Sequence, residues 1–223
     1  MSETFIDKHS GYLFSAKSSE CIEHMKVHGI FEYSLIDWCS QFLSKDKLFI
    51  DIGANIGTYS IILSKYCKEV HAFECSPDTY DNLNKSVLLN NVKNIVTHVE
   101  GLGDEEKESI FYLTSRDGGT DSFIDVPGYT SGKTIVTIKT LDSFNLTDIG
   151  FIKIDVEGFE LSCLKGCQQT LKNSNYPPFI FEANHDAWYK NMKIELFEFI
   201  ISLGYKIHPI NGYANMYLAS DHI

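Results

Sequence analysis

Carboxylates follow several apolar stretches of this sequence, each at the point where the stretch ends. In open α/β sheets, ligands bind beyond the carboxyl ends of the strands. A carboxylate there can accept sugar hydroxyls, take up a proton or help to hold a divalent cation. The spacing therefore predicts one site at which the ends of several strands meet. The acids that end apolar stretches are Asp51, Glu74, Asp155 and Glu182, and Glu157 and His185 follow closely after the last two.

A glycine turn follows the first of these acids. The run Gly53-Ala54-Asn55-Ile56-Gly57-Thr58 leads from an apolar strand into an amphipathic segment that ends near Tyr66. A strand that turns sharply into a helix presents backbone N–H groups, and glycine lets a nucleotide-like cofactor approach closely. A pyrophosphate needs the pattern Gly-x-Gly-x-x-Gly, which this turn lacks. The turn therefore favours a cofactor without phosphates, such as S-adenosylmethionine.

Three residues near the turn match the parts of that cofactor. Asp51 can reach its ammonium group, directly or through water. Glu74 ends the next strand, where an acid usually accepts the two ribose hydroxyls. Leu102, in the turn after a third predicted strand at 95–99, can hold the adenine ring. The alternatives are that Asp51 and Glu74 cap helices and that the segment around Leu102 is a plain turn.

The remaining acids and the histidine are the candidates for catalysis. Asp155, Glu157, Glu182 and His185 fall on the same predicted rim as the cofactor turn. His185 is a candidate because the unperturbed pKa of histidine as a residue type suits a general base, but a lone histidine after a strand is often structural. Asp155 and Glu182 can act as base, bind sugar hydroxyls, or together hold a divalent cation such as Mg²⁺ or Mn²⁺. Glu157 can instead cap the helix that follows it.

Strand and helix patterns alternate along most of the chain, as expected for an α/β protein. We expect one domain, with an N-terminal helical extension over residues 1–46, in which residues 1–17 form a loose arm or a short strand, and a core over 47–223. Two helices separated by Gly29 fill the rest of the extension, and they either pack against one edge of the sheet or close over the cofactor. A single helix is expected over 159–171, and Asn211-Gly212 predicts a terminal hairpin. The polar stretch 116–123 is either a substrate-facing loop or a surface hairpin, and Trp188 either covers a sugar or belongs to the core.

Composition restricts the partners and the compartment. The formal charge is −11 and Arg116 is the only arginine, so nucleic acid and anionic membrane surfaces are unexpected as partners. The six cysteines show no zinc-type spacing. No signal peptide or membrane-spanning run is recognisable, so we expect a reducing, cytoplasmic location with free thiols. The oligomeric state stays open.

With these motifs in place, the sequence resembles the FkbM-type methyltransferases over roughly residues 28 to 205. The resemblance implies a Rossmann-like class I methyltransferase fold, with a seven-stranded, mostly parallel sheet, helices on both faces and a C-terminal antiparallel hairpin. It also implies S-adenosylmethionine as donor and methylation of an oxygen, often a hydroxyl of a sugar or a polyketide. The matching runs are Phe49-Ile50-Asp51-Ile52-Gly53-Ala54-Asn55-Ile56-Gly57, Ala72-Phe73-Glu74, Leu141-Asp142-Ser143, Phe151-Ile152-Lys153-Ile154-Asp155-Val156-Glu157-Gly158-Phe159-Glu160, Leu164-Lys165-Gly166 and Phe179-Ile180-Phe181-Glu182.

Two other functions compete with an O-methyltransferase that modifies a small molecule or a sugar in a glycan. An NAD-dependent oxidoreductase would also use a strand–turn–helix unit, but the absent dinucleotide pattern and the terminal hairpin count against it. A non-catalytic binding domain could retain the same fold. The intact set of carboxylates argues against such a loss of activity.

Overall fold

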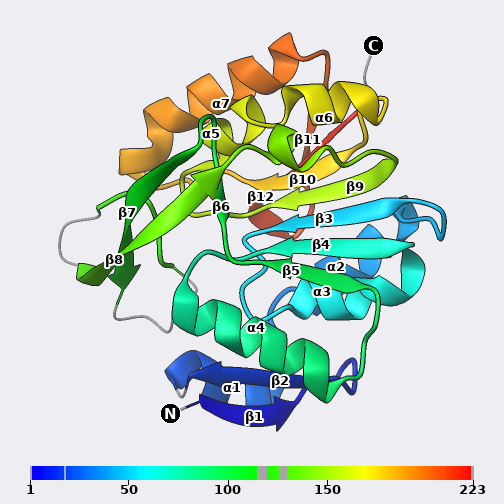
Figure 1. The fold of residues 1–223 in the computed structure, drawn as a ribbon, viewed down its shortest axis with the longest axis vertical. Coiled ribbons are helices and arrows are strands. Elements are labelled where there is room, and N and C mark those ends of the chain that lie inside the picture. The colour runs from blue at the N-terminus through cyan, green and yellow to red at the C-terminus, as the bar shows by residue number, and fades with distance from the viewer. Residues whose placement is uncertain (1, 18, 115–119, 126–129, 222–223) are drawn as a thin grey trace.

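A seven-stranded sheet forms the centre of the computed structural model, which describes residues 2–17, 19–114, 120–125 and 130–221 (Figure 1). Its strand order is β11-β12-β10-β9-β3-β4-β5. Only β12 runs antiparallel to its neighbours in this sheet, and it forms the predicted terminal hairpin with β11. The predicted class I architecture is confirmed. The strands are β3 (Leu48–Ile52), β4 (Glu69–Phe73), β5 (Ile95–His98), β9 (Ile149–Ile154), β10 (Phe179–Glu182), β11 (Lys206–Ile210) and β12 (Tyr213–Ser220).

Strand β3 shows why this sheet is buried on both faces. All five of its residues are buried, and alternate side chains point to opposite faces. Phe49 belongs to the core beneath the sheet in Figure 1, on the side of α2, α3 and α4, whereas Ile50 and Ile52 belong to the core on the side of α5, α6 and α7. The near-continuous apolar run is thus that of a parallel strand covered twice.

The helices follow the predicted pattern with one difference. The helix expected over 159–171 is two helices, which are separated at Gly166 and Cys167. A Cβ on Gly166 would lie 1.8 Å from the carbonyl oxygen of Gly103, so the chain breaks where another turn packs directly against its backbone. The helices are α1 (Glu20–His28), α2 (Tyr33–Cys39), α3 (Thr58–Leu63), α4 (Pro77–Leu89), α5 (Glu160–Lys165), α6 (Gln168–Asn173) and α7 (Lys190–Ser202), and short 3₁₀ turns cover Ser40–Phe42, Ser64–Tyr66, Leu141–Phe144 and Ala187–Tyr189.

The chain begins with a β-hairpin, so the prediction of a helical extension holds only from Glu20 onward. Strands β1 (Ser2–Ile6) and β2 (Leu13–Lys17) pair antiparallel, and Phe5 lies opposite Phe14 with both side chains buried. Side chains of α4 serve as hydrogen-bond partners for β2. Ser15 N–H donates to Ser86 Oγ at 2.9 Å, and Leu13 N–H donates to Asn90 Oδ1 at 2.9 Å.

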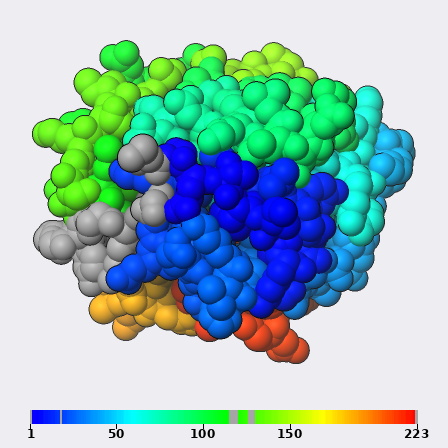
Figure 2. Space-filling model, turned by 90° about the horizontal axis from the view of Figure 1, so that it is seen from below, coloured from blue at the N-terminus to red at the C-terminus, as the bar shows by residue number. Residues whose placement is uncertain are grey.

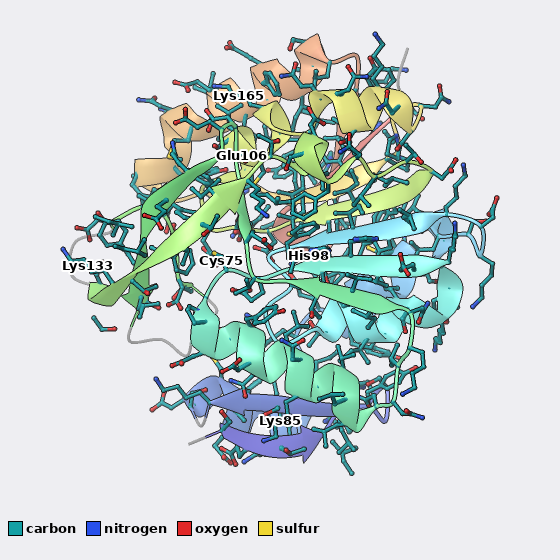
Figure 3. All side chains as sticks on the ribbon, viewed as in Figure 1. Cys75, Lys85, His98, Glu106, Lys133 and Lys165 are labelled. Carbon is teal, nitrogen blue, oxygen red and sulfur yellow. The ribbon has the colours of Figure 1, made fainter. Side chains whose placement is uncertain are left out.

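A second, smaller sheet stands beside the carboxyl ends of the central strands. It has the order β6-β8-β7, with β6 (Gly101–Leu102), β7 (Lys107–Thr114) and β8 (Thr130–Lys139). Figure 3 shows Cys75, just after β4, between this sheet and the central one. Strands β7 and β8 pair antiparallel and form a hairpin beside the end of the central sheet (Figure 1).

Candidate active site

A cavity of about 1400 Å³ lies beyond the carboxyl ends of β3, β4, β9 and β10. The β7–β8 hairpin and the N-terminal extension complete its wall. Most of the predicted site residues line this cavity, whereas Asp51, Gly57 and His185 do not. Those that line it are Gly53, Ala54, Asn55, Thr58, Glu74, Leu102, Asp155, Glu157 and Glu182.

The glycine turn is held against both neighbouring strands. The N–H groups of Gly53 and Ala54 donate to the carbonyl oxygen of Phe73, at 3.0 and 2.9 Å. Gly53 has a φ of +76°, and a Cβ there would lie 1.8 Å from the carbonyl oxygen of Asp155. A glycine is therefore required both by conformation and by close approach. Gly57 is required by its conformation, with a φ of +92°, whereas a Cβ there would meet only the end of a flexible side chain, Leu83 Cδ1 at 2.8 Å.

Glu74 is fixed at the end of β4 by the backbone. Its Oε2 accepts from the N–H of Asn55 at 3.0 Å, and its Oε1 accepts from the N–H of Ser76 at 2.8 Å. Burial raises the pKa of Glu74 to about 7, although both N–H groups favour the charged form. The carboxyl group is thus held rigidly in the cavity wall, where it can accept hydrogen bonds from a diol.

Asp51 lies behind the cavity wall. Alternation along β3 directs it toward α3, where its Oδ2 accepts from the hydroxyl of Ser60 at 2.5 Å. Its Oδ1 lies 3.7 Å from Nζ of Lys153 and has no hydrogen-bond partner among the described residues. The side chain is fully buried, so the structure does not give it the direct contact with a cofactor that the sequence suggested.

Lys153 is a site residue that the sequence reasoning missed. Its Nζ donates to the carbonyl oxygen of Gly53 at 2.7 Å, and lies 3.3 Å from Asp155 and 3.7 Å from Asp51. Burial disfavours the charged ammonium, but Asp155 and Asp51 raise its pKa above that of an ordinary lysine. The available signal was a single lysine inside a buried apolar strand. Such a charge is buried only where it is paired.

Three carboxyl groups meet on the other side of the cavity. Oxygens of Asp155, Glu157 and Glu182 all lie within 4.8 Å of one another. Burial raises the pKa of Glu157 and that of Glu182, and the charge of Asp155 raises both further. Glu157 is held in the left-handed region, with a φ of +51°. Groups this close cannot all ionise easily, so the cluster can take up a proton or accept a cation.

The comparisons with known proteins identify the family. A family model described as the methyltransferase FkbM domain matches residues 51–207, which is well over half of the chain. The chain belongs to the FkbM methyltransferase family. The family assignment favours the methyltransferase hypothesis over the oxidoreductase hypothesis. The glycine turn and the three carboxyl groups of the cluster all lie within the matched segment.

Two curated relatives of this FkbM methyltransferase are themselves methyltransferases by name. The hexuronic acid methyltransferase AglP of Haloferax volcanii is 30% identical over 185 residues, which cover 75% of this chain and 70% of that protein. Methyltransferase 1 of Beauveria bassiana is 25% identical over 168 residues, which cover 64% of this chain and 68% of that protein.

Solved structures show the same fold. The methyltransferase FkbM of Methylobacillus flagellatus is 20% identical with a TM-score of 0.56, over 79% of this chain and 44% of that one, so the match spans less than half of that protein. A Streptococcus mutans protein described as a methyltransferase, in complex with SAH, is 14% identical with a TM-score of 0.53, over 91% of this chain and 97% of that one.

In this FkbM-family chain, His185 lies apart from the acidic cluster. Its Nε2 is 2.7 Å from the carbonyl oxygen of Ala214 and 3.3 Å from the hydroxyl of Tyr217, and Nζ of Lys193 is also near. The imidazole is exposed and does not line the cavity. The geometry therefore favours a structural role for it. The alternative that Glu157 caps the next helix is not seen: the N-cap of α5, Phe159, makes no side-chain capping bond, and Glu160 accepts from the N–H of Gly158 at 3.0 Å.

The predicted substrate-facing loop at 116–123 is only partly described. Residues 115–119 lie outside the described residues, but Thr120, Asp121 and Phe123 line the cavity of this methyltransferase. The hydroxyl of Ser122 donates to the carbonyl oxygen of Glu157 at 2.7 Å, which ties the hairpin to the acidic cluster. Trp188 is 40% exposed, so it is not a core residue.

The N-terminal extension contributes a wall of the cavity, which agrees with one of the two positions considered from the sequence, that its helices close over the cofactor. Figure 2 shows the N-terminal segment spread over one face of the molecule, next to α4. From this segment Lys17, Ile22, Met25, Phe31 and Glu32 are among the residues that line the cavity. This wall precedes the matched family segment. Among the described residues, no helix is long and apolar enough to cross a membrane.

Proposed function

We propose that this methyltransferase uses S-adenosylmethionine to methylate a hydroxyl group of a small molecule, a sugar of a glycan. The observation that carries the proposal is one cavity with two features. On one side it has a glycine turn that lacks the pyrophosphate-binding pattern, and on the other a cluster of three carboxyl groups. The name of the Haloferax volcanii relative supports a sugar as acceptor. Since the chain carries a formal charge of −11, we expect neither nucleic acid nor a membrane surface as a partner.

The wall around the glycine turn fits the cofactor. Glu74 is held by two N–H groups, so its remaining lone pairs can accept the ribose hydroxyls, and Leu102 offers an apolar surface to the adenine. Gly53 lets a ligand approach the backbone of the turn. When bound, the cofactor supplies an electrophilic methyl group on a sulfonium. The chain's own task is to hold the acceptor oxygen close to that methyl group and to accept its proton.

We assign proton removal to the carboxylate of Glu182. It ends β10, lines the cavity and lies beside Asp155 and Glu157. Burial and these neighbours raise its pKa, which makes its ionised form a stronger base than an ordinary glutamate. Asp155 is held by Lys153 at 3.3 Å, so it is less free to take a proton. A bound cationic cofactor would favour the ionised form of Glu182.

A divalent cation at Asp155 and Glu182, with Glu157 as a third donor, stays a prediction. Carboxylate oxygens are the donors that Mg²⁺ and Mn²⁺ prefer, and such an ion would lower the pKa of the acceptor hydroxyl. The reducing, cytoplasmic compartment expected from the sequence remains part of this proposal.

Calorimetric titration with S-adenosylhomocysteine, beside a titration with NADH, tests the cofactor. We expect binding of the nucleoside and none of NADH, and the opposite pattern would overturn the proposed function. Methyl transfer to a panel of glycans, with EDTA or with added Mg²⁺ or Mn²⁺, then tests the acceptor and the ion. Turnover that is unchanged by EDTA would rule out the divalent cation, and transfer to none of the sugars would remove the glycan assignment.

A further inference from the structure

Glu32 is an acid of the N-terminal extension that reaches the cavity. It lies outside the segment 51–207 that the family model matches, and it lines the same cavity as the glycine turn. It precedes α2 with a φ of 58° and a ψ of 19°, a left-handed conformation that residues other than glycine seldom adopt. Strained backbone of this kind is concentrated at functional sites. The strain and the position together call for an explanation beyond packing.

One oxygen of Glu32 is held in place. The hydroxyl of Tyr59, in α3, donates to its Oε2 at 2.8 Å. Its Oε1 has no hydrogen bond to another described residue. The side chain is thus oriented by one contact and keeps an acceptor for a ligand.

The place of Glu32 relative to the turn is set by the strand order. Its carboxyl group is near enough to Asp155 and Lys153 for their charges to shift its pKa, which burial raises first. Asp155 follows β9, whereas Glu74 ends β4, and these two strands flank β3 on opposite sides. Glu32 and Glu74 therefore face the glycine turn from opposite sides. If Glu74 holds the ribose, the amino-acid end of the cofactor extends toward Glu32.

Two of the other acids near that end are less suited to an ammonium group. Asp51 is fully buried and does not line the cavity. Asp155 forms an ion pair with Lys153. Glu157 and Glu182 also line the cavity, but the proposed function places them beside the acceptor. A cation at Glu32 would offset the cost of burying its carboxylate.

We propose that Glu32 binds the α-ammonium group of the methionine end of S-adenosylmethionine. The inference rests on the proposed function, because it assigns a contact within the same cofactor site. It makes the N-terminal extension part of that site, and it replaces Asp51 as the carboxylate partner of the ammonium group.

The test compares two ligands that differ only in the amino-acid end. Titration calorimetry with S-adenosylhomocysteine and with 5′-methylthioadenosine, which lacks that end, is run on the wild type, Glu32→Gln and Glu20→Gln. Glu20 is the matched control, since it is a glutamate of the same extension that also lines the cavity but is exposed. We expect Glu32→Gln to lower the affinity for S-adenosylhomocysteine by about tenfold to a hundredfold, as for the loss of a charged hydrogen bond. It should leave 5′-methylthioadenosine within about twofold.

Other results would overturn the inference. Equal weakening of both ligands by Glu32→Gln would mean that the residue acts only by holding the fold, and thermal melting would show the same loss. Unchanged affinity for S-adenosylhomocysteine with a raised KM for the acceptor would place Glu32 on the acceptor side. If the wild type itself bound neither ligand, the proposed function would fail as well. Binding by the wild type that Glu32→Gln leaves unaltered would remove this inference alone.

Discussion

At the scale of single residues, the buried ammonium of Lys153 connects the glycine turn to the acidic cluster. Replacing it by methionine would leave Asp51 and Asp155 without their cation, and breaking a buried pair in this way costs roughly 3–5 kcal/mol. We expect Lys153→Met to lower the free energy of unfolding by about this amount in urea denaturation. The control is Lys47→Met, because Lys47 pairs with Asp148 at the surface, 3.4 Å away. That exposed pair should contribute less than about 1 kcal/mol, so similar losses in both variants would contradict the assignment.

A second prediction for a single residue concerns Glu182, the proposed general base. We expect Glu182→Gln to reduce kcat by roughly 10²–10⁴-fold, because an amide cannot take the proton of the acceptor hydroxyl. Its affinity for S-adenosylhomocysteine should stay close to that of the wild type. Steady-state kinetics and calorimetry measure both quantities, with the exposed Glu195→Gln in α7 as control. Unchanged turnover in Glu182→Gln would show that another group removes the proton.

At the scale of elements, the contact between the turn after β3 and the end of β9 sets the geometry of the site. A methyl group on Gly53 would collide with the carbonyl oxygen of Asp155. Gly53→Ala should therefore destabilise the fold by about 1–3 kcal/mol, as overpacking does, and weaken S-adenosylhomocysteine. Gly132→Ala is the control, since a Cβ there meets only Leu113 at 3.8 Å or more. A Gly53→Ala variant as stable as this control, by thermal melting, would mean that the two elements separate without cost.

The elements also show what could be predicted from the sequence. The strands, the glycine turn and the rim of acids follow from apolar runs and their ends, which local sequence records, whereas the seven-stranded sheet is implied by the family resemblance. Asp51 lies on the same face of β3 as Phe49, because alternate residues of a strand share a face. This period-two pattern already indicates that Asp51 lies behind the cavity wall. The break at Gly166 depends on a turn more than sixty positions earlier, and the wall formed by the extension depends on long-range packing. Neither leaves a local signal.

At the scale of the whole molecule, several buried acids make stability depend on pH. Burial raises the pKa of Glu74 to about 7 from 4.5, and raises those of Glu157 and Glu182 as well. The folded chain then binds more protons than the unfolded chain above the ordinary glutamate pKa, so stability falls as pH rises. The lowered pKa values of His71 and His98 act in the opposite direction, but only below the ordinary histidine value of 6.5.

We therefore expect the melting temperature of the ligand-free protein to fall between about pH 6.5 and pH 8.5. The free energy of unfolding can fall by at most about 1.4 kcal/mol per pH unit for each extra proton that the folded state binds. Calorimetric scans at three pH values in this range measure the slope, and Glu182→Gln should show a smaller one because it removes one titrating group. A melting temperature that is constant or rises over this range would contradict the burial of these acids.

The hydrogen bonds between β2 and α4 have a consequence for the order in which the protein is made. The hairpin leaves the ribosome before α4, because the side chains of Ser86 and Asn90 that hold β2 are 71 and 77 residues further along the chain than their partners. At 5–20 residues per second, this separation corresponds to roughly 4–15 s of synthesis. The hairpin must therefore wait for α4 before it can dock. The N-terminal extension, which forms a wall of the cavity, is therefore synthesised before the glycine turn. It can take its place in that wall only after the turn and α4 have emerged.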